Sequence, residues 1–294
     1  MTNKNILLSS FAASILLFSC TEKTTLSTTG SGEILKDTSY IAAVESKDPR
    51  KVLAEYATGV KCPNCPDGSK ILKEIGHDYP NRFIVAGLHA LELSDPIKGE
   101  SKYDLRSEFA RDLFATYLGN PVSKPAAAFD RLEESENSYF STARIKWPTI
   151  VEERMTVTTP LNLRVNSVFN ADSNVFIVTV TGAYTSSVSK KQFLTIMITE
   201  DSIVDVQDGA GGVIIHDYLH MHVLRDKLTQ TTGDPILSDL ASIEPGRVFV
   251  KILKYNIPEG KEWNVDHLNV IAFVHNNAGA DKEVQQAEEI KLKP

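Results

Sequence analysis

The sequence predicts an α/β domain followed by an antiparallel β-sandwich, because two patterns of apolar residues follow one another along the 294-residue chain. Between about residues 40 and 155, short apolar runs alternate with segments of helical period, which is typical of an α/β layer structure. From residue 156 onward, apolar and polar residues alternate in several short runs, which indicates antiparallel strands. We therefore place a domain boundary near residue 155.

The N-terminal segment predicts export and lipidation. Lys4 precedes an apolar run over residues 6–18, which is shorter than the roughly 20 residues of a membrane-spanning helix. Leu17-Phe18-Ser19-Cys20 resembles the box at which a lipoprotein signal peptide is cleaved before an acylated cysteine. We expect residues 1–19 to be a signal peptide, Cys20 to carry acyl chains such as palmitate, and residues 20–39 to be a flexible tether. An ordinary cleaved signal with an incidental cysteine is the alternative.

Each element of the first domain has its own signal. Residues 82–89 are a continuous apolar run of the kind that a buried strand shows. Leu105, Phe109 and Leu113 recur every four residues, which is typical of an amphipathic helix. In chain order we expect a strand over 52–57, a helix over 67–75, a strand over 82–89, a helix over 104–118, a strand over 125–129 and a helix over 138–154 that is interrupted at Pro148.

The second domain is predicted from five sets of alternating apolar residues. They lie at 161–165, 176–180, 194–198, 248–252 and 268–274, and we expect them to form an immunoglobulin-like sandwich. No element is predicted for residues 201–242, which contain the glycine-rich stretch 209–212.

A C-x-x-C motif formed by Cys62 and Cys65 follows the first strand and stands at the start of the first helix. A helix N-terminus favours thiolate over thiol and can lower a cysteine pKa from roughly 8.5 into the range of about 3.5–7.5. The approach to the motif resembles the active-site loop of thioredoxin, with Glu55 in the place of the buried acid. We expect Cys62 to be the exposed nucleophile, Cys65 the resolving thiol, Glu55 the proton acceptor beneath them and Pro125 a cis-proline facing them.

Two other interpretations of the cysteine pair remain open at this point. The pair can be a static disulfide that clamps the helix start, or it can be half of a zinc site. His216, His220 and His222 form H-x-x-x-H-x-H, but no single helix or strand places all three on one face. We expect these histidines to lie on a partly exposed loop, with a metal site as the less favoured alternative.

The charge composition of the chain bears on which kinds of partner it binds. The formal net charge is −7 and there is no basic run, which argues against nucleic acid as a partner. Nothing in the sequence indicates a cofactor. The expected partners are extracytoplasmic proteins or peptides, and the membrane through the N-terminal acyl chains.

Three stretches together resemble the outer-membrane-protein-twenty-eight family of bacterial lipoproteins. They are residues 55–66 with the core T-G-x-x-C-x-x-C-P, Pro125 with Phe129-Asp130-Arg131, and residues 218–225 with H-x-H-x-x-R. The resemblance implies an acylated N-terminus, a thioredoxin-like domain and a β-rich C-terminal domain. It leaves the activity open between a redox enzyme and a surface antigen or adhesin.

Two functions follow from these observations. In the first, an outer-membrane lipoprotein performs extracytoplasmic thiol-disulfide exchange through Cys62 and Cys65. In the second, a non-catalytic surface or periplasmic binding lipoprotein, such as an adhesin or an assembly component, carries a static Cys62–Cys65 disulfide. The exposure of Cys62 and the position of Glu55 distinguish them.

Overall fold

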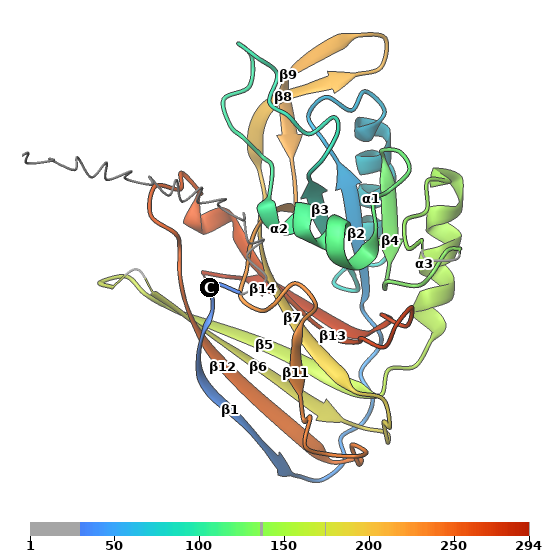
Figure 1. Cartoon of the computed structure of the whole chain (residues 1–294), viewed down its shortest axis with the longest axis vertical. Helices are drawn as coiled ribbons and strands as arrows, with labels where there is room; N and C mark the ends of the chain where they lie inside the picture. The colour runs from blue at the N-terminus through green and yellow to red at the C-terminus, as the bar shows by residue number, and fades with distance from the viewer. Residues whose placement is uncertain (1–29, 136–137, 174, 294) are drawn as a thin grey trace, which may run out of the picture.

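The protein is β-rich, with two large sheets, a small two-stranded sheet and few helices in the part of the chain that the structure describes (Figure 1). The computed structural model describes residues 30–135, 138–173 and 175–293. Within them, a four-stranded antiparallel sheet has the strand order β1-β12-β6-β5. A mixed eight-stranded sheet has the order β14-β13-β7-β10-β3-β2-β4, with β11 paired to β7. Strands β8 and β9 form a separate two-stranded sheet.

The first half of the chain supplies these elements: β1 (Glu33–Ile41), β2 (Val52–Thr58), α1 (Cys65–Asp78), β3 (Phe83–His89), α2 (Glu108–Leu113) continued by a π-helical turn (Phe114–Leu118), β4 (Ala126–Phe129), a 3₁₀ turn (Arg144–Lys146) and α3 (Trp147–Thr156). The second half supplies β5 (Leu161–Asn170), β6 (Val175–Tyr184), β7 (Gln192–Glu200), β8 (Ile203–Gly209), β9 (Val213–His220), β10 (Val223–Lys227), β11 (Asp234–Ile236), β12 (Arg247–Asn256), a 3₁₀ turn (Val265–His267), β13 (Leu268–Asn276) and β14 (Val284–Lys291).

Strand β2 shows how the upstream layers are built. It is parallel to β3 and antiparallel to β4, and α1 connects it to β3. Successive side chains of a strand point to opposite faces. Val52, Ala54 and Tyr56 therefore pack on the face covered by α1 and α3, whereas Leu53 and Ala57 pack on the face covered by α2.

The downstream core lies between the two sheets. Apolar side chains of β5, β6 and β12 meet those of β7 and β13, so the sheets pack face to face around one buried cluster. Met197 on β7 and Phe273 on β13 point the other way, into the cluster that also contains α2. The eight-stranded sheet and this cluster thus cross residue 155, and the upstream and downstream parts share them.

Several elements differ from the expected ones. Residues 33–39, which were expected to belong to a flexible tether, form most of β1 and pair with β12. The helix expected over 138–154 begins only at Trp147, because Pro148 is tolerated in the first turn and starts the helix instead of interrupting it. Residues 201–242 are rich in strands, with the β8–β9 hairpin, β10 and β11.

Candidate functional site

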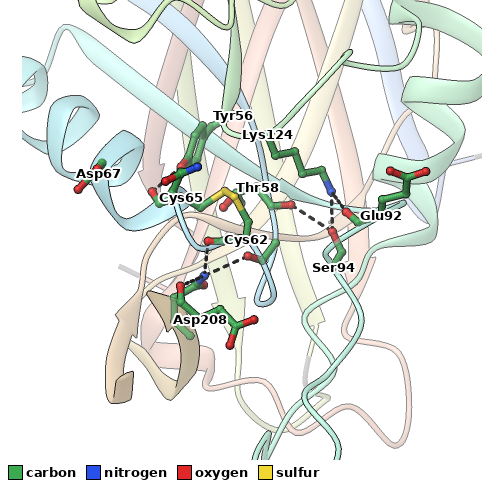
Figure 2. The surroundings of a disulfide bond; sticks show 12 residues. Tyr56, Thr58, Cys62, Cys65, Asp67, Glu92, Ser94, Lys124 and Asp208 are labelled. Atoms are coloured by element: carbon green, nitrogen blue, oxygen red, sulfur yellow. Dashed lines mark hydrogen bonds between the residues drawn. A yellow bond between two sulfur atoms is a disulfide. The ribbon is translucent and has the colours of Figure 1, made fainter. Parts of the chain in front are cut away.

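Cys62 and Cys65 form a disulfide in the turn between β2 and α1 (Figure 2). The backbone N–H of Cys62 donates to the carbonyl of Gly59 at 3.0 Å, and that of Cys65 donates to the carbonyl of Cys62 at 3.1 Å. Asn64 is the N-cap of α1, so Cys65 is its first residue. The hydroxyl of Tyr56 donates to the carbonyl of Cys65 at 2.8 Å and ties the helix start to β2.

Both cysteines are buried. The exposed fraction is 0% for Cys62 and 1% for Cys65, although Pro63 and Asn64 between them are exposed. The expectation that Cys62 is an exposed nucleophile is therefore wrong for this conformation. The physical reason is that two other segments cover residues 59–62, which we call the 59–62 turn.

The β8–β9 hairpin covers the 59–62 turn from one side. The side-chain amide of Gln207, which is 2% exposed, donates to the carbonyls of Gly59 at 3.2 Å and Cys62 at 3.0 Å. The backbone N–H of Asp208 donates to the carbonyl of Val60 at 2.8 Å. Figure 2 shows Asp208 beside Cys62. Three carbonyl oxygens of the turn are thus occupied by two neighbouring residues of β8.

The loop over residues 90–94 covers the turn from another side. The backbone N–H of Lys61 donates to the carbonyl of Leu93 at 2.8 Å. Gly59 permits this approach, since a Cβ on it would lie 2.3 Å from that carbonyl oxygen. The hydroxyl of Ser94 donates to the carbonyl of Thr58 at 3.1 Å.

Lys124 holds this loop from the residue before Pro125. Its ammonium donates to the carbonyl of Glu92 at 2.7 Å, to the hydroxyl of Ser94 at 2.8 Å and to the carbonyl of Ala90, as Figure 2 shows in part. Burial lowers the pKa of Lys124 to about 8. The three oxygen acceptors take the place of the water molecules that the Lys124 ammonium loses on burial.

Glu55 does not lie beneath the disulfide, which corrects the proton-acceptor role expected for it. It points to the face of β2 opposite Tyr56, because neighbouring residues of a strand alternate. Both of its carboxylate oxygens accept hydrogen bonds from Arg131 at 2.7 Å. The Arg131 guanidinium also lies 4.7 Å from the ring centroid of Phe273. The ion pair is buried in the cluster that contains α2, away from the cysteines.

Pro125 lies close to the helix that carries Cys65. The Lys124–Pro125 peptide bond is cis, as the sequence predicts. A Cβ on Gly68, in the first turn of α1, would lie 3.0 Å from the Cβ of Pro125 and 2.7 Å from the hydroxyl of Tyr56. Cys65, Tyr56 and Pro125 therefore converge on the start of α1.

The three histidines of the H-x-x-x-H-x-H motif have separate surroundings. His216 is exposed and lies 3.6 Å from a carboxylate oxygen of Glu100. His220 is buried on β9 with its Nε2 3.1 Å from the carbonyl of Val206, and His222 lies 3.3 Å from Asp201. The alternative of a shared metal site is therefore not supported. Among the described residues, no group of three or more histidine, cysteine, aspartate or glutamate side chains is placed to hold a metal ion.

Gln207 and Lys124 are site residues that the sequence did not single out. The hairpin that carries Gln207 has a recognisable signal, since apolar residues at 203, 204 and 206 and at 213–215 flank the stretch Gly209-Ala210-Gly211-Gly212. The packing of the hairpin against the 59–62 turn cannot be predicted from a local sequence pattern, because Gln207 and Cys62 are 145 positions apart.

The predicted signal peptide and Cys20 lie outside the described residues. Within the described ranges, no helix combines the length and apolar content needed to cross a bilayer.

Comparisons with known proteins give one family match and several structures of similar fold. The family model described as outer membrane protein Omp28 matches residues 120–293, a stretch that contains Pro125 and the β8–β9 hairpin but neither cysteine of the disulfide. HBP35 of Porphyromonas gingivalis has a similar fold, with a TM-score of 0.65, 20% identity, and 84% of this chain and 77% of that chain covered. No curated protein matches the sequence.

Two further solved structures are similar over part or most of the chain. A protein of Agrobacterium tumefaciens has a TM-score of 0.47 and 14% identity, with 84% of this chain and 96% of that chain covered. A domain of the outer membrane lipoprotein Omp28 from Porphyromonas gingivalis has a TM-score of 0.30 and 15% identity, with 46% of this chain and 90% of that chain covered.

Proposed function

The chain belongs to the Omp28 family of outer membrane proteins, and from this premise we propose that it is a lipid-anchored binding protein whose Cys62–Cys65 disulfide is structural. The burial of both cysteines carries this proposal. Thiol-disulfide exchange requires a thiolate to reach a sulfur atom, and neither sulfur is accessible in this conformation. The alternative function inferred from the sequence is thus the better supported one.

The arrangement of Glu55 supports the same conclusion. A dithiol enzyme of the thioredoxin kind uses a buried carboxylate near the pair to accept a proton, whereas Glu55 is held by Arg131 on the opposite face of β2. With Glu55 in this position, the cysteine pair lacks the base that the sequence predicted for it.

The finer description of the fold is also part of the proposal. The upstream part is thioredoxin-like, which the parallel β2–β3 pair, the connecting α1, the antiparallel β4 and Pro125 at the start of α1 support. The downstream part is an immunoglobulin-like sandwich, which the face-to-face packing of the two sheets supports. Cys20 carries the lipid anchor at the outer membrane, and residues 1–19 are removed during export.

The proposed partners are extracytoplasmic proteins or peptides. A shallow groove between α1 and residues 142–145 supports a binding role. It is lined by Asp67, Lys70, Ile71, Glu74, Thr142, Arg144 and Ile145. Ile145 is 91% exposed there, so an apolar anchor is available between charged side chains.

A turnover assay tests the proposal. Reduction of insulin disulfides in the presence of dithiothreitol is followed with the wild-type chain and with a Cys62→Ser/Cys65→Ser variant. We expect equal rates, because a structural disulfide does not cycle. Turnover that the double variant loses would overturn the proposal.

Thiol-disulfide exchange is the second candidate, and one observation favours it. The disulfide occupies the N-terminus of α1, where the helix dipole stabilises a thiolate, and Pro125 packs against the same turn. In this candidate function, Cys62 attacks a substrate disulfide and forms a mixed disulfide, and Cys65 then displaces the substrate thiol. Cysteine-dependent turnover in the same assay would establish it.

A further inference from the structure

The β8–β9 hairpin is attached to the protein differently from the other strands. Within the described ranges, β8 and β9 pair only with each other and join neither of the two large sheets. On β9 only His220 is buried, while Val213 and Leu219 are 60% and 50% exposed. Displacing the hairpin would therefore leave every backbone pairing of the two large sheets in place.

The contacts that hold the hairpin down are concentrated on a short part of β8. Besides the bonds from Gln207 and Asp208, the carboxylate of Asp205 accepts the backbone N–H groups of Lys102 at 3.0 Å and Tyr103 at 2.9 Å. A small apolar cluster lies beneath these contacts and consists of Val60, Leu105, Ile203, Val206 and Val223, with Ile97 and Ile214 at its margin. Four successive residues, 205–208, thus supply the hydrogen bonds described here and one member of the apolar cluster.

We propose that the β8–β9 hairpin is a strap that controls access to the Cys62–Cys65 disulfide, so that the bond is reduced from a state in which the hairpin has left the 59–62 turn while the rest of the fold stays intact. Segments with few buried apolar contacts open locally at a lower free energy than the whole fold. The strap goes beyond the proposed function, since it acts on a structural and on a catalytic disulfide alike.

The reduction itself has defined requirements. One thiolate of a dithiol reductant attacks a sulfur of the disulfide and forms a mixed disulfide, and its second thiolate then closes the reductant's own ring disulfide. Two electrons and two protons thereby pass to Cys62 and Cys65, and the reductant is oxidised. The first attack needs a path to a sulfur, and at 0% and 1% exposure that path is closed while the strap is in place.

The rate of reduction tests the strap. The full chain is incubated with dithiothreitol, quenched with an alkylating reagent at successive times, and the alkylation of Cys62 and Cys65 is measured by mass spectrometry. The test variant is Gln207→Ala, which removes the bonds to Gly59 and Cys62. The matched control is Gln285→Ala on β14, where the side-chain amide of a half-buried glutamine donates to the nearby carbonyl of Glu283.

We expect Gln207→Ala to be reduced about tenfold faster than wild type, since losing buried hydrogen bonds favours the open state. Gln285→Ala should be reduced at the wild-type rate. The wild-type rate should also level off at high reductant concentration, where hairpin opening becomes limiting, and should change little with low urea. Equal rates in Gln207→Ala and wild type, or rates that rise with urea as steeply as global unfolding, would overturn the strap.

Asp205→Asn guards against a Gln207→Ala variant that fails to fold. It weakens the second attachment, to Lys102 and Tyr103, and should also accelerate reduction. The two proposals fail separately. Reduction only on global unfolding would overturn the strap and leave the structural disulfide intact, whereas strap-limited reduction with insulin turnover would overturn the structural disulfide alone.

Discussion

Gln207 donates its side-chain amide to the carbonyl of Cys62 at 3.0 Å. One buried glutamine of the downstream half thus closes the turn that holds the disulfide of the upstream half. The contact places a motif that suggests redox chemistry against the β8–β9 hairpin.

Loss of the disulfide should cost a moderate part of the stability. In the chain-entropy view, a bridge that closes so short a loop contributes roughly 2 kcal/mol. We expect Cys62→Ser/Cys65→Ser to lower the free energy of unfolding in urea by about that amount, and added reductant to have no further effect on the variant. A variant as stable as the oxidised wild type would contradict a structural role.

The Glu55–Arg131 pair should be a stability determinant without influence on the cysteines. Glu55→Ala leaves the Arg131 charge buried and unpaired, which costs roughly 3–5 kcal/mol. Arg131→Met in the same chain should restore part of the loss, because it removes the uncompensated charge. The check is a double-mutant cycle in urea. A milder Glu55→Gln variant that shifts the pH dependence of Cys62 alkylation after reduction would contradict this separation.

His220 should make the protein less stable in acid. Burial lowers the pKa of His220 from 6.5 to about 4. The unfolded state then binds the proton more readily than the folded state, so stability is present above pH 6.5 and is lost as pH falls toward 4. We expect His220→Asn to lose roughly 2–3 kcal/mol less than wild type between pH 7 and pH 4. Parallel stability curves for the two proteins would refute the assignment.

Lipidation of Cys20 remains a prediction from the sequence. We expect the native N-terminal peptide to begin at Cys20 and to carry acyl chains, and the protein to fractionate with the outer membrane. Mass spectrometry of that peptide decides the matter, with Cys20→Ser as the control that loses the modification. An unmodified N-terminus, or cleavage at another position, would remove the lipid anchor.

The two parts of the chain should unfold together. The eight-stranded sheet contains β2, β3 and β4 from the upstream part and β7, β10, β11, β13 and β14 from the downstream part. We expect one unfolding transition for the full chain and poor folding of fragments 40–155 and 156–294 expressed alone, because each loses sheet partners. A stably folded 156–294 fragment would instead support a domain boundary near residue 155.

Sequence alone determined the local features of this protein. The apolar runs became strands β2, β3 and β4, and the alternating sets became β5, β6, β7, β12 and β13, because side-chain periodicity reports which face of an element is buried. The cis bond before Pro125 and the place of the cysteines at the start of α1 were also predictable, since they depend on a few neighbouring residues. The family resemblance holds as well.

Tertiary structure alone decided what these features can do. Cys62 is buried in a turn that Gln207 and Asp208 contact from a hairpin far along the chain. Glu55 pairs with Arg131 because both side chains lie on the face of β2 that α2 covers. Strand β1 forms through its pairing with β12. These contacts join segments that are distant in the sequence, so no local sequence pattern predicts them. The burial of Cys62 and the pairing of Glu55 with Arg131 are therefore decided only by the packing of the folded chain.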